Sequence, residues 1–129
     1  RRKAEELGVD AEFLQMDVLT LPSLDHQFDS VIDCGLFHVL SDADRRAYVA
    51  ALTHVTKLSG KLFLMCFSDQ EPVGPGPRRI RQDEIRAAFA EGWTVESITA
   101  THFEPNPQSK ETFVDGGPRA WFAVIRRES

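Results

Sequence analysis

Apolar residues gather along the chain in short blocks, separated by polar stretches and by stretches that contain proline or glycine. Apolar blocks of this length, bounded by turn-forming residues, are typical of strands. They predict strands at residues 12–18, 28–34, 61–67, 94–103 and 120–125. Because helical patterns stand between the second and third and between the third and fourth of these strands, we expect an α/β fold with a mostly parallel sheet.

A helix is expected at the start of the chain and another at residues 82–90. Residues 1–7 have the pattern of a helix end, because Gly8 suits the left-handed position that follows a helix C-terminus. No capping residue precedes this segment. That favours the loss of upstream sequence over a helix that simply frays at its N-terminus.

A longer helix is expected between the second and third strands. Ser41 is a favourable N-cap, and Asp44 stands where a capping box places an acidic residue. The apolar residues at helical spacing in this helix are Tyr48, Leu52, Val55 and the nearby Leu58. Gly60 is expected to end the unit.

The last two strands follow one another without a helix between them, and a polar connector at residues 104–118 joins them. They are therefore expected to form an antiparallel pair at one edge of the sheet. With 129 residues, of which 42% are apolar, the chain is expected to form a single domain, 1–129, with a buried core.

The charge balance narrows the classes of function. The formal net charge is −5 and the isoelectric point is about 5.3, whereas proteins that bind nucleic-acid phosphates need clustered basic residues. No apolar run reaches the roughly 20 residues that span a bilayer. We therefore expect neither a nucleic acid nor a membrane as a partner. Cys34 and Cys66 lie in apolar runs, which favours free thiols in a cytoplasmic protein over a disulfide framework.

Three short segments follow predicted strands, where open parallel sheets bind their ligands. They are residues 17–18, 34–38 and 68–71. Asp17 can accept a hydrogen bond from an exocyclic amine such as that of adenine, and Val18 can cover the face of an aromatic base. The alternative is an aspartate that caps nearby backbone groups, and spacing alone favours this alternative.

Gly35 lets the chain turn out of the second strand, either at positive φ or in close approach to a ligand. Cys34 is expected to be a small packed residue rather than a nucleophile, because no basic neighbour would activate its thiol. His38 can serve as a general base, since its ordinary pKa is close to neutral. The alternative is a structural ring between Phe37 and Val39. The histidines show no zinc-ligand spacing, so no metal site is predicted.

Three stretches, taken together, resemble class I S-adenosylmethionine-dependent methyltransferases, in particular the small-molecule branch that includes thiopurine- and quinone-methylating enzymes. They are FLQMDVLTLP, then FDSVIDCGLFHVL followed by AYVAALTHVTKLSGKLFLMCFSD, then QDEIRAAFAEGWTVESI. The resemblance implies a Rossmann-like three-layer sheet. It also implies S-adenosylmethionine as the cofactor and a small molecule that is methylated at an O, N or S atom.

The resemblance also implies roles for particular residues. Asp17 would meet the adenine amine, and Val18 would cover the adenine ring. The backbone at residues 34–35 would face the methionine part of the cofactor. Phe37 and His38 would face the methyl acceptor, with His38 as the catalytic residue.

The family places a glycine-rich loop after its first strand and an acidic residue at the end of its second strand. The chain has neither, so it resembles the C-terminal portion of a methyltransferase domain. In the family sheet, the two missing strands lie between the first and second strands predicted here. An unpaired strand edge would favour a homodimer.

Two alternatives to a methyltransferase stay open. One is a truncated, non-catalytic remnant that self-associates and binds no cofactor. The other is a response-regulator-like module, which is disfavoured because Asp17 and Asp33 do not supply the acidic cluster of such a site.

Overall fold

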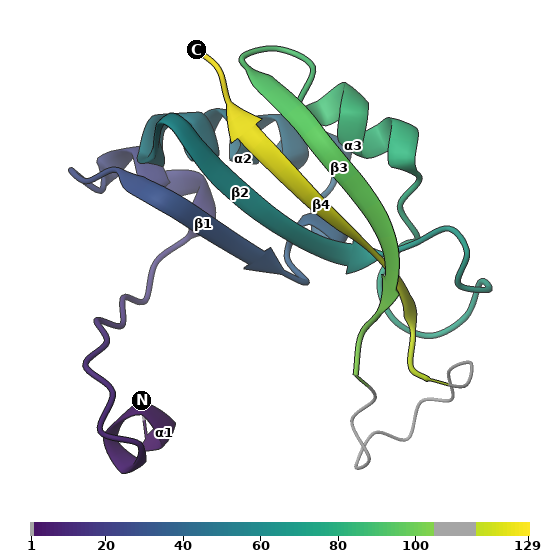
Figure 1. Ribbon diagram of the computed structural model, residues 1–129, viewed down its shortest axis with the longest axis horizontal. Coiled ribbons are helices and arrows are strands. Elements are labelled where there is room, and N and C mark those ends of the chain that lie inside the picture. The colour runs from purple at the N-terminus through teal and green to yellow at the C-terminus, as the bar shows by residue number, and fades with distance from the viewer. Residues whose placement is uncertain (1, 105–115) are drawn as a thin grey trace.

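The computed structural model describes residues 2–104 and 116–129, which form one sheet of four strands with helices beside it (Figure 1). The strands are β1 (Phe28–Cys34), β2 (Thr56–Phe67), β3 (Trp93–His102) and β4 (Arg119–Arg127). Their order across the sheet is β1-β2-β4-β3. β1 and β2 are parallel, whereas β4 runs antiparallel to both of its neighbours. This confirms the Rossmann-like α/β sheet with an antiparallel C-terminal pair.

The helices are α1 (Arg2–Glu6), α2 (Asp42–Val55) and α3 (Gln82–Ala88), with short 3₁₀ helices η1 (Val18–Ser23) and η2 (Phe37–Val39). α2 and α3 lie behind the sheet in the view of Figure 1, and among the described residues no helix covers the face turned toward the viewer. The described residues therefore supply the sheet and the helix layer on one of its faces.

The core lies between the sheet and the helices α2 and α3. Its main side chains are Phe37, Tyr48, Leu52, Leu62, Leu64, Ile85, Phe89, Trp121 and Ile125. The N-cap of α2 is the predicted one, because the Ser41 hydroxyl accepts a hydrogen bond from the Asp44 backbone N–H at 3.1 Å. The predicted apolar face of α2 is buried as far as Val55, whereas Leu58 is 64% exposed. The prediction for Leu58 was wrong because the helix ends before it.

The strand predicted at residues 12–18 is absent. Residues 11–17 form no regular structure and pair with no strand, and η1 begins at Val18. The apolar side chains of Phe13 and Leu14 are exposed. A segment becomes a strand only when a neighbour satisfies its backbone hydrogen bonds. β1, the nearest strand along the chain, pairs only with β2 among the described residues.

β2 begins at Thr56, directly after α2, rather than after Gly60 as predicted. Its pairing with β1 is interrupted near its start, so residues 57–60 form a bulge. Gly60 lies in this bulge because the backbone is crowded there. A Cβ at Gly60 would stand 2.8 Å from the carbonyl oxygen of Lys57 and 3.0 Å from that of Asp29.

The remaining predictions agree with the structure to within a few residues at element ends. Gly8 has a φ of 68° after α1, as its predicted position requires. The connector predicted at 104–118 lies largely outside the described residues. Among the described residues, no helix combines the length and apolar character needed to span a bilayer.

Candidate functional site

The chain leaves β1 through a tight turn at the end of the sheet where β1 and β2 both finish. Gly35 has a φ of 91°, a value that side-chain-bearing residues rarely adopt. Its backbone N–H donates a hydrogen bond to the Met65 carbonyl oxygen at 3.0 Å. The turn is therefore held against β2. The Cys34 side chain before it is an exposed free thiol. The prediction of a packed Cys34 was wrong, because the alternation of β1 puts this side chain on the exposed face, opposite the one that buries Asp33.

The buried carboxylate of Asp33 holds this turn in place. Asp33 is 4% exposed, and its Oδ1 accepts a hydrogen bond from the Leu36 backbone N–H at 2.9 Å. Its Oδ2 accepts a hydrogen bond from the Tyr48 hydroxyl at 2.8 Å. Burial raises the pKa of Asp33 above its ordinary value, and the hydrogen bonds from Leu36 and Tyr48 oppose that increase. The carboxyl group thus ties the turn to α2.

The pairing of Asp33 with Tyr48 was not predicted from the sequence. Two signals were present: Asp33 stands at an inward position of an apolar strand, and Tyr48 lies on the apolar face of α2. A buried tyrosine hydroxyl usually needs a hydrogen-bond partner. Pattern alone, however, does not say which residue supplies it.

His38 connects the end of β1 to the end of β2. Its Nδ1 accepts a hydrogen bond from the Phe67 backbone N–H at 2.8 Å, and the ring is buried. Burial lowers the pKa of His38; a hydrogen bond with the Gly35 backbone opposes this, and the charge of Arg79 adds to it. The ring is therefore favoured as neutral imidazole, with Nδ1 occupied and the proton on Nε2.

This tautomer bears on the predicted role of His38 as a base. A neutral ring that accepts at Nδ1 has no free lone pair at Nε2. To take a proton from an acceptor, His38 would first have to release the Phe67 N–H. The catalytic role of His38 stays a prediction, and it requires that the ring first release the Phe67 N–H. The ring also contacts Phe67 edge-on and Phe103 at a tilt, as the structural alternative expected.

Phe37 was predicted to face a methyl acceptor, but in this structure it has no exposed surface. The Arg45 guanidinium lies over its ring, 4.5 Å from the ring centroid, and the Phe89 ring packs nearby. Arg45 in turn pairs with Glu84 of α3, with 3.3 Å between Nη1 and Oε1. Phe37 therefore belongs to the core between η2 and the helices in this arrangement, and it makes no open surface for a ligand.

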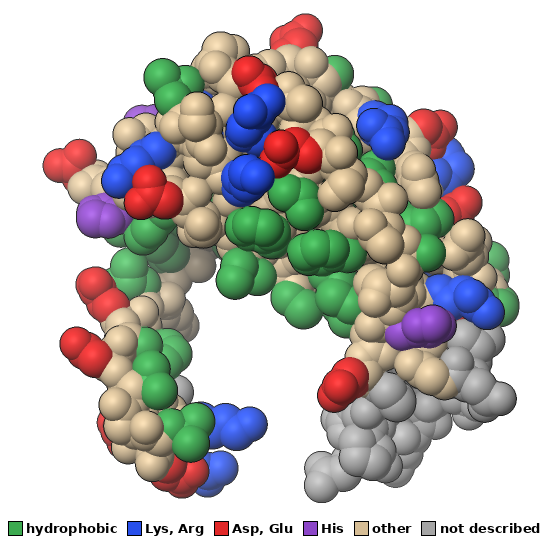
Figure 2. All heavy atoms as spheres, in the orientation of Figure 1, with side chains coloured by type: hydrophobic (Ala, Val, Ile, Leu, Met, Phe, Trp, Pro, Cys, Tyr) green, Lys and Arg blue, Asp and Glu red, His purple; other side chains and the backbone are tan. Residues whose placement is uncertain are grey.

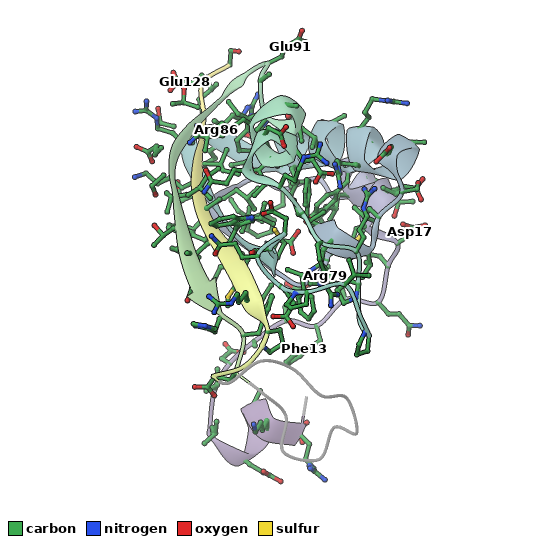
Figure 3. The ribbon with its side chains drawn as sticks, turned by 90° about the vertical axis from the view of Figure 1, so that its right-hand side faces the viewer. Phe13, Asp17, Arg79, Arg86, Glu91 and Glu128 are labelled. Atoms are coloured by element: carbon green, nitrogen blue, oxygen red, sulfur yellow. The ribbon has the colours of Figure 1, made fainter. Side chains whose placement is uncertain are left out.

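Asp17 acts as the N-cap of η1, because its Oδ1 accepts a hydrogen bond from the Leu19 backbone N–H at 2.9 Å. Asp17 therefore caps nearby backbone, which is the alternative that spacing favoured. Its second carboxylate oxygen, Oδ2, takes no part in that bond. Val18 is half-buried against the core. η1 packs on α2, and Figure 3 shows Asp17 on the helix side of the molecule, away from β3 and β4. Direct contact between Asp17 and the turn after β1 is not part of this arrangement.

A shallow pocket with a volume of 460 Å³ opens beside His38. Its other lining residues are Val39, Leu40, Ser41, Pro77 and Arg78. Arg78 is held in place at its rim by Asp42, with 2.9 Å between Nη1 and Oδ1, and by the Leu40 carbonyl oxygen. The pocket therefore combines an apolar wall with a fixed guanidinium group.

Arg79, which Figure 3 labels, organises the loop that follows β2. Its guanidinium donates hydrogen bonds to the carbonyl oxygens of three prolines in that loop, Pro72, Pro75 and Pro77. It also lies over the Phe67 ring, 5.1 Å from the centroid. Arg79 therefore joins the loop beside the pocket to the strand end that His38 contacts.

The described residues fit part of an S-adenosylmethionine site. Asp17 keeps a carboxylate oxygen beyond the one in the cap, which suits an adenine amine, and Cys34 is exposed at the turn. They contain no glycine-rich loop after a strand. They also bring together no group of three histidine, cysteine, aspartate or glutamate side chains that could hold a metal.

Comparison with known proteins places this arrangement in context. The family model described as thiopurine S-methyltransferase matches residues 3–127. A 2-heptyl-1-hydroxyquinolin-4(1H)-one methyltransferase of Mycobacteroides abscessus is 27% identical over 130 residues, covering 98% of this chain and 55% of its own length. An uncharacterized methyltransferase of Schizosaccharomyces pombe is 35% identical over 60 residues, covering 46% of this chain and 41% of its own.

Solved structures show the same similarity. A protein studied for the conversion of a disulfide bond into a thioacetal group during echinomycin biosynthesis superposes with a TM-score of 0.80 and 30% identity, covering 98% of this chain and 60% of its own. A 1,6-didemethyltoxoflavin-N1-methyltransferase of Burkholderia thailandensis, solved with S-adenosylhomocysteine, superposes with a TM-score of 0.69 and 18% identity, covering 99% of this chain and 56% of its own. This likeness supports the fold alone. The chain thus spans about half the length of the relatives it matches.

Proposed function

Because the chain belongs to the thiopurine S-methyltransferase family, we propose that it serves in the transfer of a methyl group from S-adenosylmethionine to an O, N or S atom of a small molecule. The observation that carries this proposal is the turn after β1. Gly35 at positive φ is bonded to β2 and lies next to the buried His38, and the residue before it, Cys34, is exposed at the carboxyl end of the sheet. Ligands of open α/β sheets bind at that end.

The proposed cofactor contacts follow from the same residues. When bound, S-adenosylmethionine supplies an electrophilic methyl group on a sulfonium. Oδ2 of Asp17 accepts a hydrogen bond from the adenine amine while Oδ1 keeps its bond to Leu19. Val18 covers the adenine ring, and the backbone of Cys34 and Gly35 faces the methionine part. These residues contribute by orienting the reactants, which is how much of the acceleration of a displacement reaction arises.

The proposed acceptor is a planar aromatic small molecule. The Mycobacteroides abscessus relative is named for a hydroxyquinolinone substrate. In this chain, the pocket beside His38 has the apolar wall and guanidinium rim that suit a ring with a polar substituent. His38 faces the acceptor in this proposal. If His38→Asn, which keeps an acceptor for the Phe67 N–H but cannot take a proton, has the kcat of the wild type, then His38 is not the base.

A second candidate is a truncated remnant that binds no cofactor. Two observations favour it: residues 11–17 pair with no strand, and the described residues contain no glycine-rich loop. Both candidates fit a cytoplasmic protein, because Cys34 and Cys66 are free thiols. For either candidate we also propose association of two copies through a strand edge.

Methyl transfer is tested by incubating the chain with S-adenosylmethionine and a hydroxyquinolinone, then measuring S-adenosylhomocysteine by mass spectrometry. The informative variant is Asp17→Asn, which keeps an oxygen for the cap but puts a donor where the adenine amine needs an acceptor. We expect roughly a tenfold loss of cofactor affinity, since a hydrogen bond to a charged group is worth about 1.5–3 kcal/mol.

Asp25→Asn is the matched control, because Asp25 is an exposed carboxylate that the proposed site does not use. It should behave like the wild type. If the chain yields no product and neither variant changes the affinity for the cofactor, the result would favour the truncated remnant.

A further inference from the structure

The loop that follows β2 is closed at its base. The Ile80 backbone N–H donates a hydrogen bond to the Phe67 carbonyl oxygen at 2.9 Å, and the Asp69 backbone N–H donates one to the Ile80 carbonyl oxygen at 3.0 Å. The two ends of the segment 69–80 therefore meet. Compact surface loops whose ends lie close together and whose own side chains pack them are frequently functional.

This loop lies beyond the end of β2 rather than over the middle of the sheet. Figure 1 shows it past the arrowhead of β2, on the way to α3. Figure 2, in the same view, shows hydrophobic side chains gathered in the middle of the molecule, on the sheet face turned toward the viewer. The loop thus occupies the carboxyl end of β2, where open α/β sheets bind their ligands.

A single guanidinium group holds the inside of the loop. Nε and Nη2 of Arg79 donate hydrogen bonds to the Pro72 carbonyl oxygen at 3.2 and 2.7 Å. Its Nη1 donates to the carbonyl oxygens of Pro75 and Pro77 at 3.1 and 2.7 Å. Prolines have no backbone N–H, so these three residues cannot hydrogen-bond to one another. The planar fork of an arginine joins them from two of its edges, which the compact ammonium group of a lysine does not.

The loop is also packed on the ring of Phe67, the last residue of β2. The Arg79 guanidinium lies over that ring, 5.1 Å from its centroid. Gly76 approaches the same ring so closely that a Cβ there would stand 3.1 Å from Cε2 of Phe67. The Phe67 ring in turn contacts the His38 ring edge-on, with 5.2 Å between the ring centroids. Arg79 therefore holds the loop on a ring that touches His38.

Two residues of the loop line the pocket beside His38, namely Pro77 and Arg78. Pro77 accepts one of the Arg79 hydrogen bonds, and Arg78 lies between Pro77 and Arg79 in the chain. The other lining residues of this pocket are residues 38–41. One wall of the pocket thus belongs to the loop that Arg79 holds, and the width of the pocket depends on where that loop sits.

We propose that Arg79 is a positioning residue for the methyl acceptor, because it holds the pocket wall that Pro77 and Arg78 supply. This inference rests on the proposed function and deepens it by separating the acceptor wall from the cofactor contacts. No residue of the loop is among those proposed to contact S-adenosylmethionine. Loss of Arg79 should therefore weaken acceptor binding and leave cofactor binding as it is.

NMR relaxation tests the hold on the loop without any ligand. The backbone amides of Val73, Gly74 and Gly76 should have order parameters near about 0.85 in the wild type and below about 0.6 in Arg79→Gln. Gly76→Ala, which brings a Cβ against the Phe67 ring at a φ of 95°, should lower them as well. Equal order parameters in the wild type and Arg79→Gln would mean that Arg79 does not hold the loop, and would overturn the proposal.

Calorimetric titration tests the consequence for the acceptor, with a hydroxyquinolinone as the probe. Arg79→Gln has only two side-chain N–H donors for three carbonyl oxygens. It should raise the Kd for the hydroxyquinolinone roughly tenfold, because binding would then have to order the loop. Arg79→Lys keeps the charge without the planar fork and should lose as much. Arg86→Gln, at an exposed residue of α3 outside the loop, is the matched control and should bind like the wild type.

The same variants titrated with S-adenosylmethionine separate positioning from general destabilisation. We expect the cofactor Kd of Arg79→Gln to equal that of the wild type. A parallel rise in both Kd values, or a hydroxyquinolinone that binds the wild type no better than Arg79→Gln, would overturn the proposal. Failure of the methyl transfer itself would be seen as absent S-adenosylhomocysteine, and the comparison of hydroxyquinolinone Kd values does not depend on that product.

Discussion

The Tyr48 hydroxyl donates a 2.8 Å hydrogen bond to Oδ2 of Asp33, and this bond ties α2 to the end of β1. The other carboxylate oxygen of Asp33 holds the Leu36 backbone N–H. Between these two bonds lies the turn at Cys34 and Gly35, the backbone proposed to face the cofactor. The geometry of the site is therefore set by a buried pair that would not itself touch a ligand.

Tyr48→Phe should destabilise the fold, because it leaves Oδ2 of a buried carboxyl group without its donor. An unsatisfied buried polar group costs about 1–3 kcal/mol, and we expect the free energy of unfolding from urea titration to fall by that amount. The pKa of Asp33 should rise further, because the hydrogen bond from Tyr48 lowers it in the folded protein.

The control for this pair is a double-mutant cycle with Asp33→Asn. If the two side chains interact as the structure indicates, the double variant should lose less stability than the two single variants together. Strictly additive losses would mean that the hydrogen bond contributes nothing to the stability.

Gly60→Ala should destabilise the chain by about 1–3 kcal/mol, the usual cost of overpacking. The added Cβ would stand 2.8 Å from the Lys57 carbonyl oxygen, and backbone atoms cannot move aside cheaply. Gly74→Ala is the matched control, because the nearest atom to its Cβ would be 3.8 Å away, an ordinary van der Waals distance. Thermal unfolding of both variants checks this, and equal Tm values would contradict the bulge at residues 57–60.

His38 should make the stability of the chain depend on pH. Its pKa is lowered in the folded state, so below its ordinary value of 6.5 the unfolded chain binds more protons than the folded one. Stability should therefore fall as the pH drops through 6.5, by up to about 1.4 kcal/mol per pH unit, and level off below the folded pKa. His38→Asn keeps an acceptor for the Phe67 N–H and should flatten this slope in urea titrations between pH 5 and pH 8. If the wild type and His38→Asn show the same dependence of stability on pH, the His38 ring is not held neutral in the folded protein.

Gly35→Ala should weaken cofactor binding. An alanine at a φ of 91° is strained by about 1–2 kcal/mol, and moving the turn to relieve that strain should raise the Kd for S-adenosylmethionine roughly tenfold. Gly8→Ala, at a φ of 68° and far from the turn, carries a similar strain and should bind like the wild type. Equal losses of binding in the two variants would point to general destabilisation rather than to the turn.

The sequence predicted the elements whose pattern is local. β1 was placed correctly because an apolar run is bounded by turn residues on both sides, and α2 because its cap and its apolar face agree. The failures depend on partners distant in sequence. Residues 12–18 have strand composition but no neighbour to pair with, and β2 gains its first residues from pairing with β1.

The candidate site divides in the same way. Gly35 was predicted from its place after a strand, and its positive φ agrees with that expectation. The Asp33–Tyr48 bond and the hydrogen bond that occupies Nδ1 of His38 could not be predicted, because each joins residues fifteen or more positions apart. Local patterns do not determine such contacts; the packing of α2 and β2 against β1 does.

The central claim is that this chain contains enough of the site to hold its cofactor, and calorimetric titration with S-adenosylmethionine tests it most directly. We predict a saturable isotherm with one site per chain and a higher Tm in the presence of the cofactor, since a ligand that binds only the folded state stabilises it. Asp17→Asn should raise the Kd for S-adenosylmethionine, and Asp25→Asn should leave it unchanged. A flat isotherm and an unchanged Tm for the wild-type chain would contradict the account and favour a remnant that has no cofactor site.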